Sequence, residues 1–131
     1  MAVLPQALKD ILQDKVFVHL STLMPDGSPQ SSPVWVDLDG DEILINTALG
    51  RVKDRNMKRD PRVAVSLTSA HDHYRAYMIR GRVTGHTTVG ADAHIDRLSK
   101  KYLGVDRYPR RSSGEVRVIF RITADVIATM G

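Results

Sequence analysis

The basic run between Arg51 and Arg62 holds the residues of this sequence that are best suited to binding an anion. It follows a strand-like segment, Glu42 to Asn46, and then Gly50, so a short helix is predicted to begin near Arg51. The first N–H groups of a helix have no intrahelical partners and its dipole favours negative charge there, whereas Arg51 and Lys53 oppose that dipole. The pattern predicts a phosphate or carboxylate site, and the alternative is a solvated charged face. The cations of the run are Arg51, Lys53, Arg55, Lys58, Arg59 and Arg62, against only Asp54 and Asp60.

A second basic segment, Asp106 to Gly114, reads DRYPRRSSG and combines arginines with one aromatic ring. Its candidate residues are Arg107, Tyr108, Arg110 and Arg111. One interpretation is that it contacts the anionic tail of a ligand from a neighbouring subunit. The other is that it is a solvated loop.

Other chemically capable residues give weaker signals. His71 and His73 flank Asp72, but a His-x-His in a polar loop is usually a solvated turn and no third ligand is evident, so no metal site is predicted. Tyr74 and Tyr77 differ by three positions, so in a strand they face opposite sides and at most one can line a given pocket. No nucleophile–base pattern and no glycine-rich nucleotide loop occurs, and the catalytic residues stay unassigned.

The composition predicts one small domain, residues 1–131. The 131 residues are 42% hydrophobic, which is enough for a single core. Because there are no cysteines, disulfides, thiolate nucleophiles, iron–sulfur clusters and cysteine-based zinc sites are excluded. The net charge of +4 suits an anionic ligand. No apolar run is long enough for a membrane span and the N-terminus lacks signal-peptide features, so a cytoplasmic location without membrane contact is expected.

Strand patterns dominate the chain and three helices interrupt them. Helices are predicted over 4–14, after Thr47 to about Asp60, and over 91–103, where Gly104 would end the last one. Pro61 stops the basic helix, since the residue before proline leaves the helical region. Gly81 and Gly85 indicate a bulge or a close backbone approach. Strands are predicted over 16–24, 29–38, 42–47, 62–69, 74–88, 115–123 and 125–129.

Two hairpin turns, at Pro25–Ser28 and Asp39–Asp41, indicate an antiparallel meander. With no internal repeat and no linker, the expected fold is mainly β with peripheral helices. The specific expectation is a six-stranded antiparallel split β-barrel with helices packed outside it.

The segment from Ser21 to Leu67, containing DGSPQ, VW, NT, GRVKDRN and RDPR in that order, carries a family resemblance. It resembles the pyridoxamine 5'-phosphate oxidase-like, FMN-binding split β-barrel proteins, and more closely their branch that uses the deazaflavin coenzyme F420. The later pieces YRAYMIRGRVTG, HIDRLSKKYLG and YPRRSSGEVRVIFRI are also similar, so the resemblance covers nearly the whole chain. It implies a homodimer with two cofactor sites at the subunit interface.

The resemblance also implies which residues bind the cofactor. The phosphate-binding segment falls on Arg51, Lys53, Arg55 and Asn56. The ring-cradling positions fall on Gln30, Ser31, Ser32, Pro33, Val34 and Trp35, with Asn46 and Thr47 on the adjacent strand. Tyr77, Tyr108 and Arg110 complete the candidate set. Trp35 could stack on a cofactor ring or a partner chain, or could be a core anchor.

One departure bears on the cofactor. Flavin mononucleotide (FMN) oxidases of this family carry an arginine near the start of the ring-cradling strand, where this chain has Gln30. The prediction is therefore an F420-dependent reductase that transfers a hydride to an unsaturated small molecule. The alternatives are an FMN-dependent enzyme of the same fold and a non-catalytic F420 carrier. Nucleic-acid binding is disfavoured, because only 5% of the residues are aromatic and no strand shows paired stacking rings.

Overall fold

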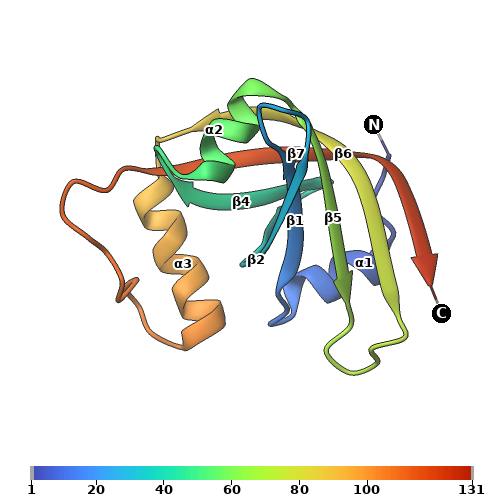
Figure 1. The fold of residues 1–131 in the computed structure, drawn as a ribbon. Helices are drawn as coiled ribbons and strands as arrows, with labels where there is room; N and C mark the ends of the chain where they lie inside the picture. Colours follow the sequence, from blue (N-terminus) through green and yellow to red (C-terminus); the bar gives the residue numbers. More distant parts are fainter. Residues whose placement is uncertain (1, 131) are drawn as a thin grey trace.

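The computed structural model describes residues 2–130, which form one antiparallel sheet flanked by three helices (Figure 1). The strands are β1 (Val18–Leu23), β2 (Pro29–Val34), β3 (Asp37–Asp39), β4 (Glu42–Ala48), β5 (Arg62–Thr68), β6 (Ala76–Thr87) and β7 (Arg117–Met130). The helices are α1 (Gln6–Gln13), α2 (Val52–Arg59) and α3 (Ala91–Leu103). The mainly β class with peripheral helices is thus confirmed.

The sheet has seven strands in the order β2-β1-β5-β6-β7-β4-β3, and not the six expected. Strands β2 and β3 are its two edges and do not pair with each other, so the ladder is not closed. They come from the single strand predicted over 29–38, which breaks at Trp35 and Val36. The break has a physical cause, because α3 satisfies the backbone there: the Val36 N–H donates to Tyr102 Oη at 3.0 Å, and Lys101 Nζ donates to the Val36 carbonyl at 3.0 Å.

The last strand also differs from the prediction. Residues 117–130 form one long strand, β7, where two shorter strands had been expected. It pairs with β4 through its first half, and with β6 from Ile119 to Met130. The predicted irregularity at Gly81 and Gly85 is confirmed by register shifts next to both residues. At Gly81 a Cβ would overlap the carbonyl oxygen of Thr123, so only glycine allows this approach of the strands.

The main core lies between the strands and α1. Alternate residues of the strands point into it, as in β1, where Val18 and Leu20 are buried. Helix α1 covers one end of this core with Leu8 and Leu12, and α2 adds Met57. Each such apolar side chain contributes about 1.5–3 kcal/mol when fully buried.

Helix α3 packs through a separate, smaller cluster. Its buried residues Ile95, Leu98 and Tyr102 contact the partly buried Trp35 and Tyr108. The helix ends at Gly104, as predicted, where φ is 73° and the N–H donates to the Lys100 carbonyl. This cluster places α3, the break in the β2–β3 run and the loop after α3 side by side, near the end of β4 that leads into α2 (Figure 1). No helix within residues 2–130 is long and apolar enough to cross a membrane.

Candidate functional site

A hollow of about 210 Å³ lies where the end of β2, the middle of β4, the first turn of α2, helix α3 and the start of β7 meet. Its wall joins a polar, positively charged side to an aromatic side. The lining residues are Phe17, Pro33, Val34, Trp35, Asn46, Thr47, Arg51, Lys53, Ile95, Tyr108 and Arg117.

Positive charge exceeds negative charge around this hollow. Arg51, Lys53 and Arg117 line it, and one carboxylate, Glu115, pairs with two of them. Glu115 Oε1 accepts from Arg51 at 2.9 Å and from Arg117 at 3.1 Å. Three cations against one carboxylate leave two positive charges uncompensated, which is the electrostatic requirement for holding a phosphate.

Lys53 is the clearest member of this cluster. Burial lowers the pKa of its ammonium group, and the neighbouring charges of Arg51 and Arg117 lower it further. Burial also lowers the pKa of Arg117, against the opposing effect of Glu115. Within residues 2–130 no carboxylate pairs with Lys53. A bound anion would supply the missing countercharge.

The neutral donors of the site are also without partners. Thr47 is 1% exposed, lines the hollow, and its hydroxyl oxygen has no hydrogen-bond partner among the described residues. Helix α2 begins at Val52 after Arg51, with no side-chain cap on its first N–H groups. A buried hydroxyl without a partner costs free energy unless a ligand satisfies it.

The aromatic side is built around Trp35. Its ring stacks on Tyr102 with a centroid distance of 4.9 Å and an interplanar angle of 3°, and Tyr108 meets it edge-on at 6.0 Å. Trp35 therefore both anchors α3 and lines the hollow, so the two predicted roles are compatible. Phe17, which is 55% exposed, forms the outer rim.

The structure gathers eight of the residues predicted from the sequence into this one hollow. They come from β2 and the break that follows it, β4, the start of α2 and the loop after α3, segments that are up to 75 residues apart in the chain. The eight are Pro33, Val34, Trp35, Asn46, Thr47, Arg51, Lys53 and Tyr108.

Two predicted phosphate ligands have other roles in the described structure. Arg55 donates to the Gly50 carbonyl at 2.7 Å and so closes the turn before α2. Asn56 is 2% exposed and faces β1, where its amide donates to Thr22 Oγ1 at 3.0 Å. Neither side chain lines the hollow.

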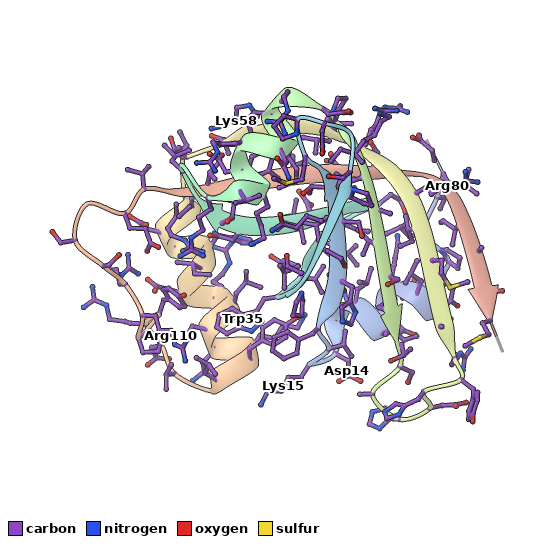
Figure 2. The ribbon with its side chains drawn as sticks, in the orientation of Figure 1. Asp14, Lys15, Trp35, Lys58, Arg80 and Arg110 are labelled. Atoms are coloured by element: carbon purple, nitrogen blue, oxygen red, sulfur yellow. The ribbon has the colours of Figure 1, made fainter. Side chains whose placement is uncertain are left out.

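The remaining predicted residues lie outside the hollow. Gln30, Ser31 and Ser32 lie on β2 before the part that lines it. Tyr77 lines a neighbouring hollow of about 310 Å³ that shares only Phe17 with the candidate site. Arg110 is exposed on the loop after α3 (Figure 2).

The loop after α3 is tied down by its own charges. Asp96 on α3 accepts from the Tyr108 N–H at 2.8 Å and from Arg111 at 2.6 Å, and Asp92 lies 3.5 Å from Arg111. These contacts hold Tyr108 against the hollow. Arg111, which the sequence offered as a tail ligand, is already paired within the chain.

Three lining residues were missed from the sequence: Phe17, Ile95 and Arg117. Arg117 is 5% exposed and reaches diagonally across the β4–β7 ladder, donating to Asn46 Oδ1 at 2.9 Å. Its guanidinium also lies 5.3 Å from the Tyr108 ring centroid. The only local signal for it is a charged residue at the start of an otherwise apolar strand.

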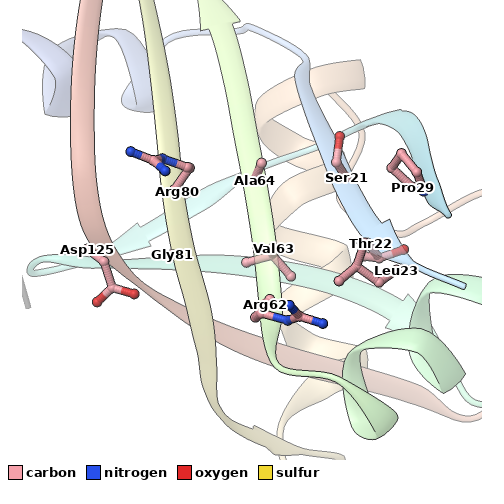
Figure 3. A pocket seen from close by; sticks show the side chains of 10 residues that line it. All are labelled: Ser21, Thr22, Leu23, Pro29, Arg62, Val63, Ala64, Arg80, Gly81 and Asp125. Atoms are coloured by element: carbon pink, nitrogen blue, oxygen red, sulfur yellow. The ribbon is translucent and has the colours of Figure 1, made fainter. Parts of the chain in front are cut away.

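A second hollow, of about 340 Å³, lies across β1, β5, β6 and β7 and differs in character (Figure 3). Its arginines include Arg62, which pairs with Asp60 at 2.8 Å, outside the hollow. Asp125 also lines it and pairs with Arg82 at 2.6 Å, and much of the remaining wall is small or apolar, as at Ala64 and Pro29. No group of three or more potential metal ligands occurs among residues 2–130, and His71 instead lies 3.3 Å from Asp14.

Comparison with solved structures finds the same fold in proteins of several descriptions. A protein described as an F420 reductase is 27% identical, with a TM-score of 0.82 over 95% of this chain and 98% of that one. A putative pyridoxamine 5'-phosphate oxidase from Listeria innocua is 19% identical, with a TM-score of 0.72 over 95% of both chains. The heme storage protein HutZ from Vibrio cholerae is 13% identical, with a TM-score of 0.68 over 99% of this chain and 96% of that one.

No curated protein matches the sequence. The family model of pyridoxamine 5'-phosphate oxidase, in contrast, matches residues 4–131, which is nearly the whole chain. The relatives at 19% and 13% identity share the fold, and the family match extends that likeness to the sequence itself. The chain belongs to the pyridoxamine 5'-phosphate oxidase family.

Proposed function

We propose that this protein is a coenzyme F420-dependent reductase that uses the hollow between β4, α2 and α3 to hold the cofactor. The observation that carries the proposal is the excess of positive charge around Lys53, beside the unpartnered hydroxyl of Thr47. The likeness to a protein described as an F420 reductase, at 27% identity over 95% of this chain, supports the choice of cofactor.

The residues present fit a phosphorylated cofactor with a planar ring. Arg51, Lys53 and the first N–H groups of α2 would hold the phosphate, and Thr47 would donate its otherwise unpartnered hydroxyl. Trp35 and Val34 offer apolar surface for the ring system. Each charge-assisted hydrogen bond of this kind contributes about 1.5–3 kcal/mol to binding.

The bound cofactor would supply hydride chemistry toward an activated C=C, C=N or C=O bond of a small-molecule acceptor. The contribution of this chain would be to bind, to orient and to exclude water. The aromatic rim of Phe17, Trp35 and Tyr108 would do the last, because apolar side chains around a charged pocket keep the local dielectric low. His71, His73, Tyr74 and Tyr77 carry groups that can donate a proton, and none of them lines the hollow.

FMN is the second candidate cofactor, because its phosphate would suit the same cations. F420 is preferred for two reasons. Gln30 stands where FMN oxidases of this family carry an arginine, and Arg107 and Arg110 form no ion pair within residues 2–130 and lie exposed on the loop whose Tyr108 lines the hollow. F420 has a longer anionic tail than FMN, and these two arginines would suit it.

The deciding experiment titrates the purified protein with oxidised F420 and, separately, with FMN. We expect F420 to bind with the lower dissociation constant. Tight FMN binding without measurable F420 affinity would overturn the proposal. Reduced F420 is then offered with a panel of unsaturated acceptors, and cofactor oxidation is followed by absorbance. Binding without turnover of any acceptor would favour a non-catalytic carrier.

We also propose that two copies of the chain assemble into a homodimer. The outer face of β6 and β7 exposes Met78, Val126 and Met130, which are 41%, 45% and 49% exposed. These residues share one face, because Met78 pairs with Ala128 and Arg80 with Val126 in the β6–β7 ladder. A permanent interface would bury about 2,000 Å² or more. Sedimentation should show a dimer at micromolar concentration, and a stable monomer would contradict this proposal.

A further inference from the structure

His94 on α3 is fully buried, does not line the hollow, and yet connects to it through hydrogen bonds. The side chain is 0% exposed. Its Nε2 lies 2.8 Å from Asp37 Oδ2, at the start of β3. Its Nδ1 lies 3.0 Å from the amide nitrogen of Asn46 on β4. The ring therefore bridges β3, which begins directly after the break at Trp35 and Val36, and β4.

The hydrogen-bond roles in this chain of contacts are forced by chemistry. Arg117 Nε can only donate, so the Asn46 atom that faces it at 2.9 Å must be the amide oxygen. The amide nitrogen of Asn46 then faces the Ala91 carbonyl at 3.0 Å, which can only accept. Two independent partners thus fix the same orientation of the Asn46 amide.

This orientation in turn fixes the state of the histidine. The Asn46 N–H needs a lone pair on His94 Nδ1, so that atom carries no proton. The proton of the neutral ring then sits on Nε2 and points to the Asp37 carboxylate. Asp37, His94, Asn46 and Arg117 form one directed series of hydrogen bonds that ends in the hollow.

We propose that His94 is a positioning residue for Arg117. By accepting from Asn46, together with the Ala91 carbonyl, it holds the amide oxygen toward Nε, and so fixes the guanidinium at the wall of the hollow. Arg117 keeps two further contacts, Glu115 at 3.1 Å and the Tyr108 ring at 5.3 Å, but neither fixes Nε. The consequence for ligand affinity rests on the proposed function, whereas the consequence for Arg117 does not.

Two substitutions test the roles of the two ring nitrogens of His94 separately. The amide of asparagine reaches the position of Nδ1, so His94→Asn keeps an acceptor for Asn46 and loses the bond to Asp37. The amide of glutamine reaches the position of Nε2, so His94→Gln keeps a donor for Asp37 and loses the acceptor for Asn46. Each variant loses one buried hydrogen bond. If the role of His94 were only structural, the two variants should therefore lose similar amounts of stability and of ligand affinity.

The first measurement follows the Arg117 Nε–H signal by NMR in the protein without ligand. We expect the Arg117 Nε–H to have the same chemical shift and the same slow exchange with water in wild type and in His94→Asn. In His94→Gln we expect the chemical shift to change and the exchange to become fast. The His94 ring of the wild type should show a protonated Nε2 and an unprotonated Nδ1. A proton on Nδ1, or an unchanged Arg117 signal in His94→Gln, would overturn the proposal. If His94→Gln does not fold, His94→Leu, which removes both nitrogens, should lose the same signal.

The second measurement is the dissociation constant for oxidised F420. His94→Asn should stay within about threefold of wild type, and His94→Gln should bind about five- to tenfold more weakly, the effect of about one hydrogen bond. Equal weakening in the two variants would contradict the positioning role. If wild type does not bind F420 at all, the proposed function fails, while the Arg117 signal still decides the role of His94.

Discussion

The two halves of the basic run from Arg51 to Arg62 are alike in composition and opposite in electrostatic environment. In the second half each cation has its own partner: Lys58 pairs with Asp54 at 2.9 Å, Arg62 pairs with Asp60 at 2.8 Å, and Arg59 donates to the Leu23 carbonyl at 2.9 Å. In the first half, Arg51 shares the one carboxylate Glu115 with Arg117, and Lys53 has none within residues 2–130.

The helix dipole increases this difference. Lys58 and Arg59 lie in the last turn of α2, where positive charge is stabilised, whereas Arg51 and Lys53 lie at its start, where positive charge is opposed. The number of cations in a segment therefore does not mark an anion site. The mark is a cation, such as Lys53, that the fold half-buries without pairing it with a carboxylate.

The largest predicted effect tests this contrast with one lysine from each half. Lys53→Ala should weaken F420 binding about 10- to 100-fold, since a charge-assisted contact contributes about 1.5–3 kcal/mol. The stability of the ligand-free protein should stay the same or rise, because burial and two like charges already disfavour the charged lysine. Isothermal titration and thermal unfolding measure the two quantities.

Lys58→Ala is the matched control, and we expect the opposite result, a loss of stability without a loss of affinity. Lys58 pairs with a carboxylate whose side chain is only 4% exposed, so its removal should cost about 0.5 kcal/mol or more of stability. F420 affinity should not change. A weakening of binding equal to that of Lys53→Ala would show that the whole run, and not its first half, attracts the ligand.

The second-largest predicted effect compares two buried threonines, Thr47 at the candidate site and Thr22 beside Asn56. Thr47 has a hydroxyl without a partner among residues 2–130, and Thr22 accepts from Asn56 at 3.0 Å. Thr47→Val should weaken F420 binding about fivefold and should not destabilise the ligand-free protein, because it removes an unsatisfied buried group. Thr22→Val should instead lower the unfolding temperature and leave binding intact. Equal affinities for wild type and Thr47→Val would remove Thr47 from the site.

Several features of the fold could be predicted from the sequence because each depends on residues that are close together in the chain. Helix α3 matches the predicted range 91–103, α2 ends before Asp60 and Pro61, and the irregularity at Gly81 is real. Each rests on residues within a few positions of the feature. The eight predicted residues that line the hollow belong to short motifs of the same kind.

The failures have non-local causes. The strand over 29–38 breaks because Tyr102 and Lys101, more than 60 residues later, take the backbone groups of Val36. Arg117 reaches the site through the register of β7 against β4, which no motif states. Asn56 belongs to the phosphate-binding motif by resemblance, but it faces β1, because the helix presents its other side to the hollow.

The pH dependence of binding is the third test of the contrast. Burial, Arg51 and Arg117 lower the pKa of Lys53 below the usual 10.5, and a bound phosphate would raise it again. Binding therefore takes up a proton once the pH exceeds the lowered pKa of Lys53, so F420 affinity should fall as the pH rises past that pKa. The stability of the ligand-free protein has the opposite sign and rises over the same interval. In Lys53→Arg the affinity should be nearly flat, and a wild-type affinity independent of pH would contradict the buried charge.

The smallest predicted effect extends the contrast to the loop after α3, where paired and unpaired arginines again lie side by side. Arg111 is held by Asp96 at 2.6 Å, whereas Arg107 and Arg110 are exposed and form no ion pair within residues 2–130. Replacing both Arg107 and Arg110 by Gln should weaken F420 binding by about twofold per residue, because exposed charge contacts contribute only about 0.2–1 kcal/mol. The loss should disappear in high salt, and FMN affinity should not change, since FMN lacks the long tail. Arg111→Gln should instead release Tyr108 from the hollow and weaken both cofactors alike. A double variant that lost F420 and FMN affinity equally would mean that the exposed arginines act on the whole site and not on the tail.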